Sequence, residues 1–417
     1  MPTARSTPQH APARDRAWIF GLLIAPSGVL ANGVIQGGVL GYLLSLQAVD
    51  SGTQAYLIGL LSLPTSLYFL WSPVTDFFIR RRTWLLVGAL LAALLTLLGF
   101  RQPQLSSHGA LLLMLVAACC SQLVVSSAGG MMGALRSEQS RRRAGSFYQA
   151  GSAGFGALSA WALIYLSSRV SRNTLGLITA ALIALPALFA LAAPHQEQLL
   201  EQGLGATMRR VWGECKDTFG RWDALPYVAC MVLPIASGAA TGLLPGVAIQ
   251  YGVTGDNVAW INGLVGGIVT AAGAGAMSLL RTRMRAPVLY SVVGLVNCAC
   301  LATLWLGPMR PATYYVGVLL YVFTLGACLA VFTAVVLEFL GEAGKSGSAR
   351  YSLINSLGNI PVLYMLQVDG WGGDHGGARG LAAAETVIGA IGAVALLAYF
   401  LIRKPARTHL AGEPPSV

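Results

Sequence analysis

Charged residues are scarce in this chain of 417 residues, of which only 10% are Asp, Glu, Lys or Arg. Soluble domains carry about 25% charged residues, so the composition excludes an ordinary soluble fold. Hydrophobic residues make up 55% of the chain. They gather in runs long enough to cross a bilayer, which takes about 20 mainly apolar residues. The sequence therefore predicts an all-α membrane protein with many transmembrane helices.

The chain also lacks the patterns of metal and catalytic sites. Six of its seven cysteines lie in apolar runs, where a thiol usually serves as a small hydrophobic group, and their spacing fits no zinc site. Its five histidines all lie outside those runs. The segment 341–346 resembles the end of a phosphate-binding loop, but Phe339 stands where that motif needs glycine. We therefore predict no enzyme activity, no cofactor and no metal.

Twelve apolar segments are long enough to be spans. We place them near 17–47, 55–75, 84–100, 109–132, 147–167, 174–193, 225–250, 257–280, 287–307, 313–341, 351–369 and 381–402. With the N-terminus in the cytoplasm, 22 of the 27 Lys and Arg lie on the cytoplasmic side; the other five are Arg101, Arg169, Arg172, Arg310 and Arg379. Such a bias orients membrane proteins and predicts that both termini are cytoplasmic. The net charge of +11 then reflects topology in the lipid bilayer, and no nucleic-acid partner is expected.

The longest polar break, 194–224, repeats apolar residues every three or four positions, which is typical of an amphipathic helix on a membrane surface. It predicts a linker between two six-helix bundles, 17–193 and 225–402, with cytoplasmic tails at 1–16 and 403–417. The basic cluster at 281–285 follows the eighth span as Arg80 to Arg82 follow the second. Paired six-helix halves around a site at the membrane midplane are typical of major-facilitator transporters.

Asp76 lies just before Arg80, Arg81 and Arg82, in a short turn between the second and third spans. The position predicts that these four residues form a cytoplasmic gate, whose contacts are made in one conformation of the transporter and broken in the other. The alternative is a solvated acid beside arginines, an arrangement that stabilises little.

Glu338 and Glu385 are the acids set deepest in the predicted spans. A carboxylate inside a membrane is a functional candidate because its ionised form is costly there. Both are therefore candidates for proton coupling. Alternatively each lies close enough to a span end to reach the membrane surface.

No Lys, Arg or His lies inside the twelve segments. The polar groups of the spans are amides and aromatic residues, which suit a glycan, a peptide-like solute or a neutral chelate. For each residue taken alone, packing is the alternative role. The candidate substrate-binding residues are Asn32, Gln36, Tyr68, Trp71, Gln122, Gln149, Asn262, Asn355, Asn359 and Tyr364.

The run Phe69-Leu-Trp-Ser-Pro-Val-Thr-Asp76 resembles the peptide/acetyl-coenzyme A transporter branch of the major facilitator superfamily, which includes the AmpG-type muropeptide permeases. Tyr68 stands where that branch has a lysine. Two further segments are similar to motifs of the branch: 348–353, entering span eleven, and 136–138, after span four. The resemblance covers the whole chain.

It implies a secondary active transporter of the bacterial inner membrane that alternates access and imports a cell-wall-derived glycopeptide, a muropeptide-like solute, together with protons. The branch also contains siderophore carriers, so a siderophore or another amphipathic small molecule is the alternative substrate. A membrane scaffold or sensor that transports nothing is the alternative of another class.

Overall fold

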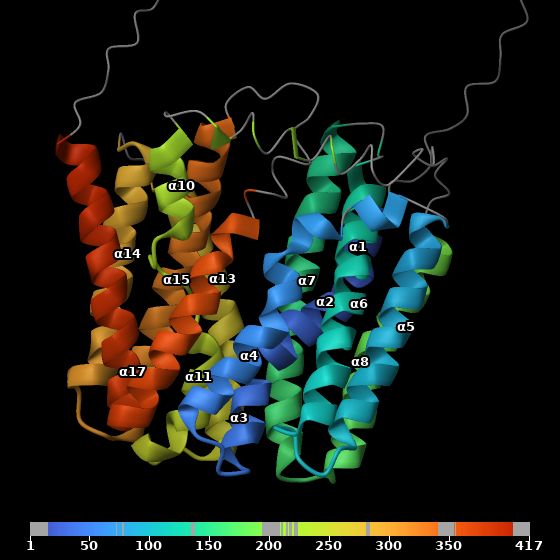
Figure 1. Cartoon of the computed structure of the whole chain (residues 1–417), viewed down its shortest axis with the longest axis horizontal. Coiled ribbons are helices and arrows are strands. Elements are labelled where there is room, and N and C mark those ends of the chain that lie inside the picture. The colour runs from blue at the N-terminus through green and yellow to red at the C-terminus, as the bar shows by residue number, and fades with distance from the viewer. Residues whose placement is uncertain are drawn as a thin grey trace, which may run out of the picture.

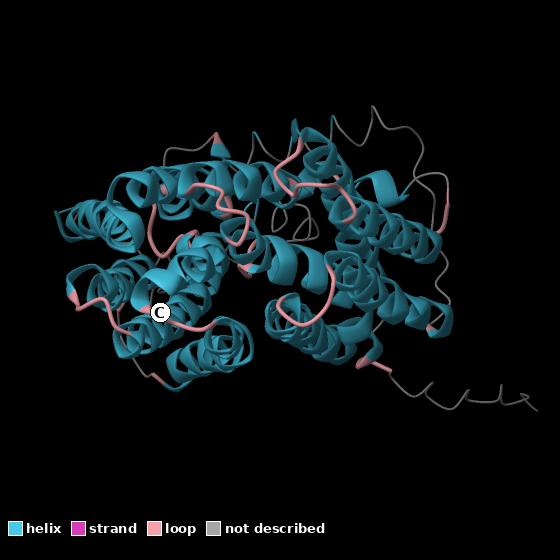
Figure 2. Ribbon diagram, turned by 90° about the horizontal axis from the view of Figure 1, so that it is seen from below, coloured by secondary structure: helices cyan, strands magenta, loops and turns pink. Residues whose placement is uncertain are grey.

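The described part of the chain is built entirely of helices. The computed structural model describes residues 16–402 except 72, 77–78, 134, 136–137, 194–208, 210–211, 214–215, 217–218, 221–223, 281–283, 341–353 and 355, and it contains no strand within them. Figure 1 shows the helices of the first half of the chain on one side and those of the second half on the other. Figure 2 shows the same bundle of helices from below. Helices satisfy their own backbone polar groups, which lipid cannot do.

Each half is a series of helices and short helical turns. The first half consists of α1 (Ile19–Leu23), α2 (Ala25–Ser27), η1 (Gly28–Ile35), α3 (Val39–Ser45), α4 (Ser51–Ser66), η2 (Tyr68–Leu70), η3 (Pro73–Asp76), α5 (Arg81–Phe100), α6 (His108–Gly133), α7 (Glu138–Ser167), α8 (Arg172–Ala187) and η4 (Leu188–Ala192). The second half consists of α10 (Leu225–Val232), α11 (Ala240–Val247), η6 (Ala248–Tyr251), α12 (Gly255–Val258), η7 (Ala259–Val265), α13 (Gly266–Leu279), α14 (Ala286–Leu306), α15 (Pro311–Leu340) and α17 (Ile360–Ile402).

These helices make twelve passes through the bundle. Nine helical stretches among the described residues are long and apolar enough to cross a membrane. Eight of them are single spans, and the ninth, Ser356–Ile402, folds back on itself and supplies two. The shorter α4 supplies one more, and the consecutive pair α10 and α11 supplies the last. The predicted all-α architecture of two six-helix halves is confirmed.

The bundle has two distinct sides. On one side, uppermost in Figure 1, α1 begins and α17 ends; we call it the terminal side. The other, the hairpin side, carries the short loops 46–50, 101–107, 168–171, 252–254 and 307–310. The tails and most of the linker 194–224 lie outside the described residues, so those predicted segments stay predictions.

The boundary predicted between the last two spans was wrong. The sequence predicts a loop at 370–380, but the chain is helical up to Gly376 and again from Ala378, and the reversal is confined to Gly377. The backbone there has φ 58°, a conformation that glycine adopts readily. Glycines let the two helical segments approach closely, since Gly372 packs on the backbone of Gly380. Span eleven is therefore longer than predicted.

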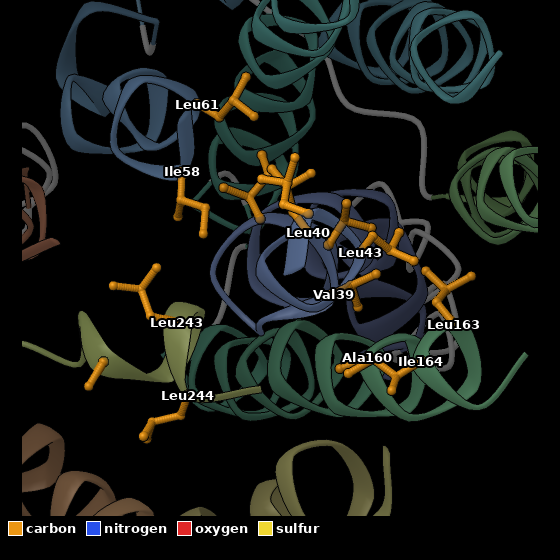
Figure 3. Packing of buried hydrophobic residues seen from close by; sticks show 14 of the residues in the cluster. Val39, Leu40, Leu43, Ile58, Leu61, Ala160, Leu163, Ile164, Leu243 and Leu244 are labelled. Carbon is orange, nitrogen blue, oxygen red and sulfur yellow. The ribbon is translucent and has the colours of Figure 1, made fainter. Parts of the chain in front are cut away.

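The main apolar core lies where the two halves meet. Figure 3 shows Val39, Leu40 and Leu43 of α3 surrounded by side chains of three other helices. Those neighbours are Ile58 and Leu61 on α4, Ala160, Leu163 and Ile164 on α7, and Leu243 and Leu244 on α11. Helix α11 belongs to the second half, so burial of apolar surface joins the two bundles.

Candidate functional site

The first helix of each half is interrupted near its middle. In the first half the π-helical segment η1 ends at Ile35, and α3 begins only after Gly38, which has φ 86°. In the second half α10 ends at Val232 and α11 begins at Ala240, with positive φ at Ala236 and Gly238 between them. Transporters place such breaks at the membrane midplane, where irregular backbone lines a polar site.

The segments that follow the two breaks, α3 and α11, pack directly on each other. A Cβ atom at Gly38 would collide with the ring of Pro245, and one at Gly41 would collide with the carbonyl oxygen of Gly242. The hydroxyl of Thr241 donates a hydrogen bond to the carbonyl oxygen of Gln36 at 3.3 Å. Small residues therefore bring the backbones of the two halves into contact.

Asn32 and Gln149 are brought to the same part of the first half. Asn32 is the only exposed residue between Ile19 and Leu44, in a helix that is otherwise buried or half-buried. Its amide nitrogen donates to the hydroxyl of Ser152 on α7 at 2.9 Å. Gln149 is exposed and precedes Ser152 by three residues, so both lie on one face of α7. One exposed amide thus lies on η1 and another on the face of α7 that contacts η1.

Three other candidates of the first half surround α4. Gln122 of α6 is buried and donates to the hydroxyl of Thr65 at 3.1 Å. The indole nitrogen of Trp71 donates to the carbonyl oxygen of Pro64 at 3.1 Å. The half-buried Tyr68 has its hydroxyl 3.6 Å from the position that a Cβ atom of residue 129 would occupy. Gln122 and Trp71 use these bonds to hold α4 in place.

The candidates of the second half are dispersed. The amide of Asn262 donates to the hydroxyl of Tyr314 at 2.8 Å, and the hydroxyl of Tyr364 donates to the carbonyl oxygen of Val232, where α10 ends, at 2.7 Å. Asn359 is half-buried near the start of α17. Asn355 lies outside the described residues. Tyr364 therefore contacts the broken helix of this half.

The arginines of the predicted gate contact the first half. Arg81 donates to the carbonyl oxygen of Gly130 at 2.8 Å, and Arg82 donates to that of Leu191. These carbonyls lie in the last turns of α6 and η4, where a helix presents partial negative charge. Arg80 is exposed. Asp76 ends η3, and its side chain lies outside the described part.

Glu338 lies near the terminal side, in contact with charged and polar groups. Its carboxylate accepts a hydrogen bond from the hydroxyl of Tyr227 at 2.8 Å and from the backbone N–H of Ala286 at 3.2 Å. One of its oxygens lies 3.7 Å from a guanidinium nitrogen of Arg285, and its side chain is 34% exposed. Glu338 therefore reaches the surface and ties α15 to the starts of α10 and α14.

Two contacts between the halves on the hairpin side escaped the sequence analysis. Arg169, in the loop after α7, forms a bidentate salt bridge with Asp256 of α12 at 2.7 and 2.8 Å. Asp374 of α17 accepts from the backbone N–H of Gly52, at the start of α4, at 2.9 Å. The distribution of Lys and Arg places Arg169 in a loop outside the cytoplasm. It does not show which loops of the two halves meet, so the partner of Arg169 could not be predicted.

Glu385 and Asp369 form the one pair of buried carboxyl groups among the described residues. Asp369 is fully buried, and Glu385 is 4% exposed. Glu385 accepts from the hydroxyls of Ser237 at 2.7 Å and Tyr321 at 3.3 Å. The sequence analysis missed Asp369 because it ended span eleven at that residue. The continuation of α17 to Gly376 carries Asp369 inward.

Two helical halves, each interrupted in its first helix, define a transporter that spans the membrane many times. A family model described as the Major Facilitator Superfamily matches residues 18–363, and the chain belongs to this superfamily. It is a secondary transporter of small molecules rather than an enzyme, as the sequence predicted.

Solved structures share its fold at low sequence identity. The nucleoside transporter NupG has a TM-score of 0.69 and 13% identity, over 93% of this chain and 99% of that one. A D-xylose–proton symporter has a TM-score of 0.64 and 14% identity, over 91% and 95%. A bacterial homologue of the human lysosomal transporter Spinster, inward-facing and unoccupied, has a TM-score of 0.63 and 14% identity, over 94% and 96%. No curated protein sequence matches this chain.

Proposed function

We propose that this chain is a proton-coupled importer of the bacterial inner membrane that takes up a cell-wall-derived glycopeptide of the muropeptide type. The observation that carries the proposal is the interruption of the first helix in both halves. Each break frees backbone polar groups within a span, and a transported polar solute is a suitable partner for them.

The side chains near the breaks favour a solute rich in hydroxyl and amide groups. Asn32 and Gln149 are exposed amides on facing helices, and each presents both donors and an acceptor. Sugars and peptide bonds offer the complementary groups. The resemblance of Phe69 to Asp76 to the AmpG-type branch supports the same solute class.

One aromatic contact favours the alternative, a siderophore or another amphipathic molecule. Trp161 of α7 and Trp260 of η7 come from different halves, with ring centroids 5.4 Å apart. Trp260 is 43% exposed. Such a pair suits an aromatic ligand, because offset aromatic rings attract one another.

Thermal-shift measurements on the purified protein test the substrate class. We expect anhydro-muropeptides to raise the melting temperature, since a ligand that binds only the folded state stabilises it. Stabilisation by siderophores alone would select the alternative, and stabilisation by neither class would contradict both. In vesicles, accumulation that persists after an uncoupler collapses the proton gradient would rule out proton coupling.

The bias of Lys and Arg supports an orientation with both termini in the cytoplasm. On that orientation the terminal side is cytoplasmic, and Asp76 with Arg80 to Arg82 would form the gate on that side. We expect Asp76→Asn to slow uptake and to change which side of the protein a membrane-impermeant thiol reagent reaches. Unchanged uptake and accessibility would contradict the gate.

A further inference from the structure

The fold of α17 places two carboxyl groups opposite each other inside the second half. Asp369 lies eight residues before Gly377 and Glu385 eight residues after it, so the two legs of the hairpin bring them to the same depth. That depth is about 12 Å from the turn, at about 1.5 Å per residue. The two carboxyl groups interact directly with each other.

The pair lacks donors for most of its oxygens. Glu385 Oε1 accepts from Ser237 and Tyr321, but the buried Glu385 Oε2 and both carboxylate oxygens of Asp369 have no hydrogen-bond donor among the residues that the structure describes. The titratable groups facing the pair are Tyr321 of α15, Tyr364 of α17 and Cys298 of α14. Among the described residues, no Lys, Arg or His acts on either carboxyl.

A single proton shared by the two carboxyl groups would remove both the repulsion between them and the lack of a donor. Two adjacent carboxylates repel each other, and a buried carboxylate without a donor costs several kcal/mol. A proton on one carboxyl gives an O–H that donates to the other, which removes one charge and supplies the missing donor. The pair then titrates as a unit that holds one proton.

We propose that Asp369 and Glu385 together form the proton-binding site of this transporter, and that Ser237 passes its protonation state to the contact between the halves. The proposal rests on the proposed function, because it names the residues that would carry the coupled proton. Nothing in the sequence resemblance assigns a role to Asp369 or Ser237.

Ser237 lies in the interruption between α10 and α11. Its hydroxyl donates to Glu385 at 2.7 Å and accepts from the backbone N–H of Ala239 at 3.0 Å, directly before α11. Helix α11 in turn packs on α3 through Gly242 and Pro245. When the proton leaves, repulsion between the carboxylates moves Glu385, and the start of α11 loses its anchor. Protonation therefore favours the conformation in which α11 stays against α3.

Infrared spectroscopy of the purified full-length protein tests the site without any substrate. A protonated buried carboxyl shows a carbonyl stretch, which we expect in the wild type at neutral pH and expect to lose in Asp369→Asn and in Glu385→Gln. Asp50→Asn is the matched control, because Asp50 is exposed and Asn caps a helix about as well as Asp; it should keep the band. A wild type without the band, or a band that survives in both variants, would overturn the proposal.

Thermal melting supplies a second readout. The melting temperature of the wild type should fall as alkaline pH removes the shared proton, whereas Asp369→Asn and Glu385→Gln should melt independently of pH in that range. An amide has nearly the shape of the protonated acid, so both variants should fold. A purely structural pair predicts two destabilised variants whose melting follows the same pH dependence as the wild type. Stabilisation of the wild type by sodium ions instead of protons would also overturn the assignment.

Vesicles loaded with a pH dye and given an anhydro-muropeptide separate this proposal from the proposed function. Losing one coupled proton should lower the accumulation driven by a potential of about 100 mV by about 50-fold in Glu385→Gln. Exchange of internal for external muropeptide should continue. A wild type that does not transport this probe would contradict the proposed substrate but leave the infrared result standing. Unchanged proton-driven accumulation in both variants would overturn the site alone. Ser237→Ala should keep the infrared band but accumulate less.

Discussion

The two halves interrupt the same helix but differ in the polar side chains that lie beside the break. In the first half, the amide of Asn32 on η1 donates to the hydroxyl of Ser152 on α7. In the second, the break at Ser237 leads to the carboxyl pair of Asp369 and Glu385. Among the described residues these two acids are the only buried charged side chains. A repeated architecture thus places exposed neutral amides in one half and titratable carboxyl groups in the other.

The halves also close the hairpin side through equivalent contacts of different chemistry. The start of α4 in the first half receives the carboxylate of Asp374, while α12 in the second half carries Asp256, which receives Arg169. One contact is a carboxylate at a helix N-terminus, where the helix dipole favours negative charge. The other is an exposed ion pair, which contributes little on its own. Equivalent positions in a repeat therefore preserve a contact without preserving its residues.

The largest expected effect distinguishes the two breaks. Gly38→Ala forces a side chain into positive φ and into the ring of Pro245, whereas the nearest atoms to a Cβ at Gly238 are 3.6 Å away. Positive φ alone costs an L-residue about 1–2 kcal/mol. We expect Gly38→Ala to lower the melting temperature clearly more than Gly238→Ala and to abolish uptake. Gly154→Ala, which meets no atom within 4 Å, is the control. Equal losses at 38 and 238 would mean that the contact with α11 contributes nothing.

The next largest effect concerns the polar contacts that stabilise each half on the terminal side. Arg81→Gln removes a charged hydrogen bond to the carbonyl oxygen of Gly130 from a half-buried side chain, and such bonds contribute about 1.5–3 kcal/mol. Glu338→Gln leaves an amide able to accept from Tyr227 and removes only a partly exposed ion pair, worth about 1 kcal/mol or less. Denaturant titration should therefore show the larger loss for Arg81→Gln. A reversed order would contradict the assignment of these contacts.

A smaller effect concerns the start of α4, where two carboxylates accept hydrogen bonds from backbone N–H groups. Asp50 accepts from the N–H of Thr53 at 2.7 Å, and this bond lowers the pKa of Asp50 below its ordinary value of 3.8. The bond therefore stabilises the fold above that value and is lost as the pH falls through the folded pKa. Asp50→Ala should cost about 1 kcal/mol at neutral pH, and Asp50→Asn much less. Melting curves should show the difference between Asp50→Ala and the wild type shrinking in strong acid. A difference that stays constant down to that pH would contradict the cap.

The smallest effect on stability is expected at the ion pair between the halves. Arg169→Gln should have only a small effect on stability, because an exposed ion pair contributes little. Asp374→Asn should cost about 0.3–1 kcal/mol, the contribution of a charge at a helix N-terminus. Both should increase the labelling of a cysteine introduced on the hairpin side by an impermeant reagent. High salt should imitate Arg169→Gln, since it screens exposed charges. No change in labelling in either variant would show that these contacts do not hold the halves together.

The fold class followed from the sequence because twelve apolar runs and the distribution of arginine leave few alternatives in a bilayer. The candidate site followed only in part. Asn32, Gln149 and Glu385 were identified as polar residues within spans, and the structure places the first two on helices that contact each other. The carboxylate partner of Glu385 was not identified, because an acid at the presumed end of a span is ordinarily solvated.

The sequence by itself determined the class of this protein, a membrane transporter of twelve helices, since hydrophobic length and charge bias act locally along the chain. The tertiary structure alone decided which polar groups meet. The reversal at Gly377 sets Asp369 against Glu385, the interruption at Ser237 ties that pair to α11, and the loops of opposite halves bring Arg169 to Asp256. These contacts join residues that are 16 to 148 positions apart. Only helix packing, which a local hydrophobic pattern does not encode, brings such residues together.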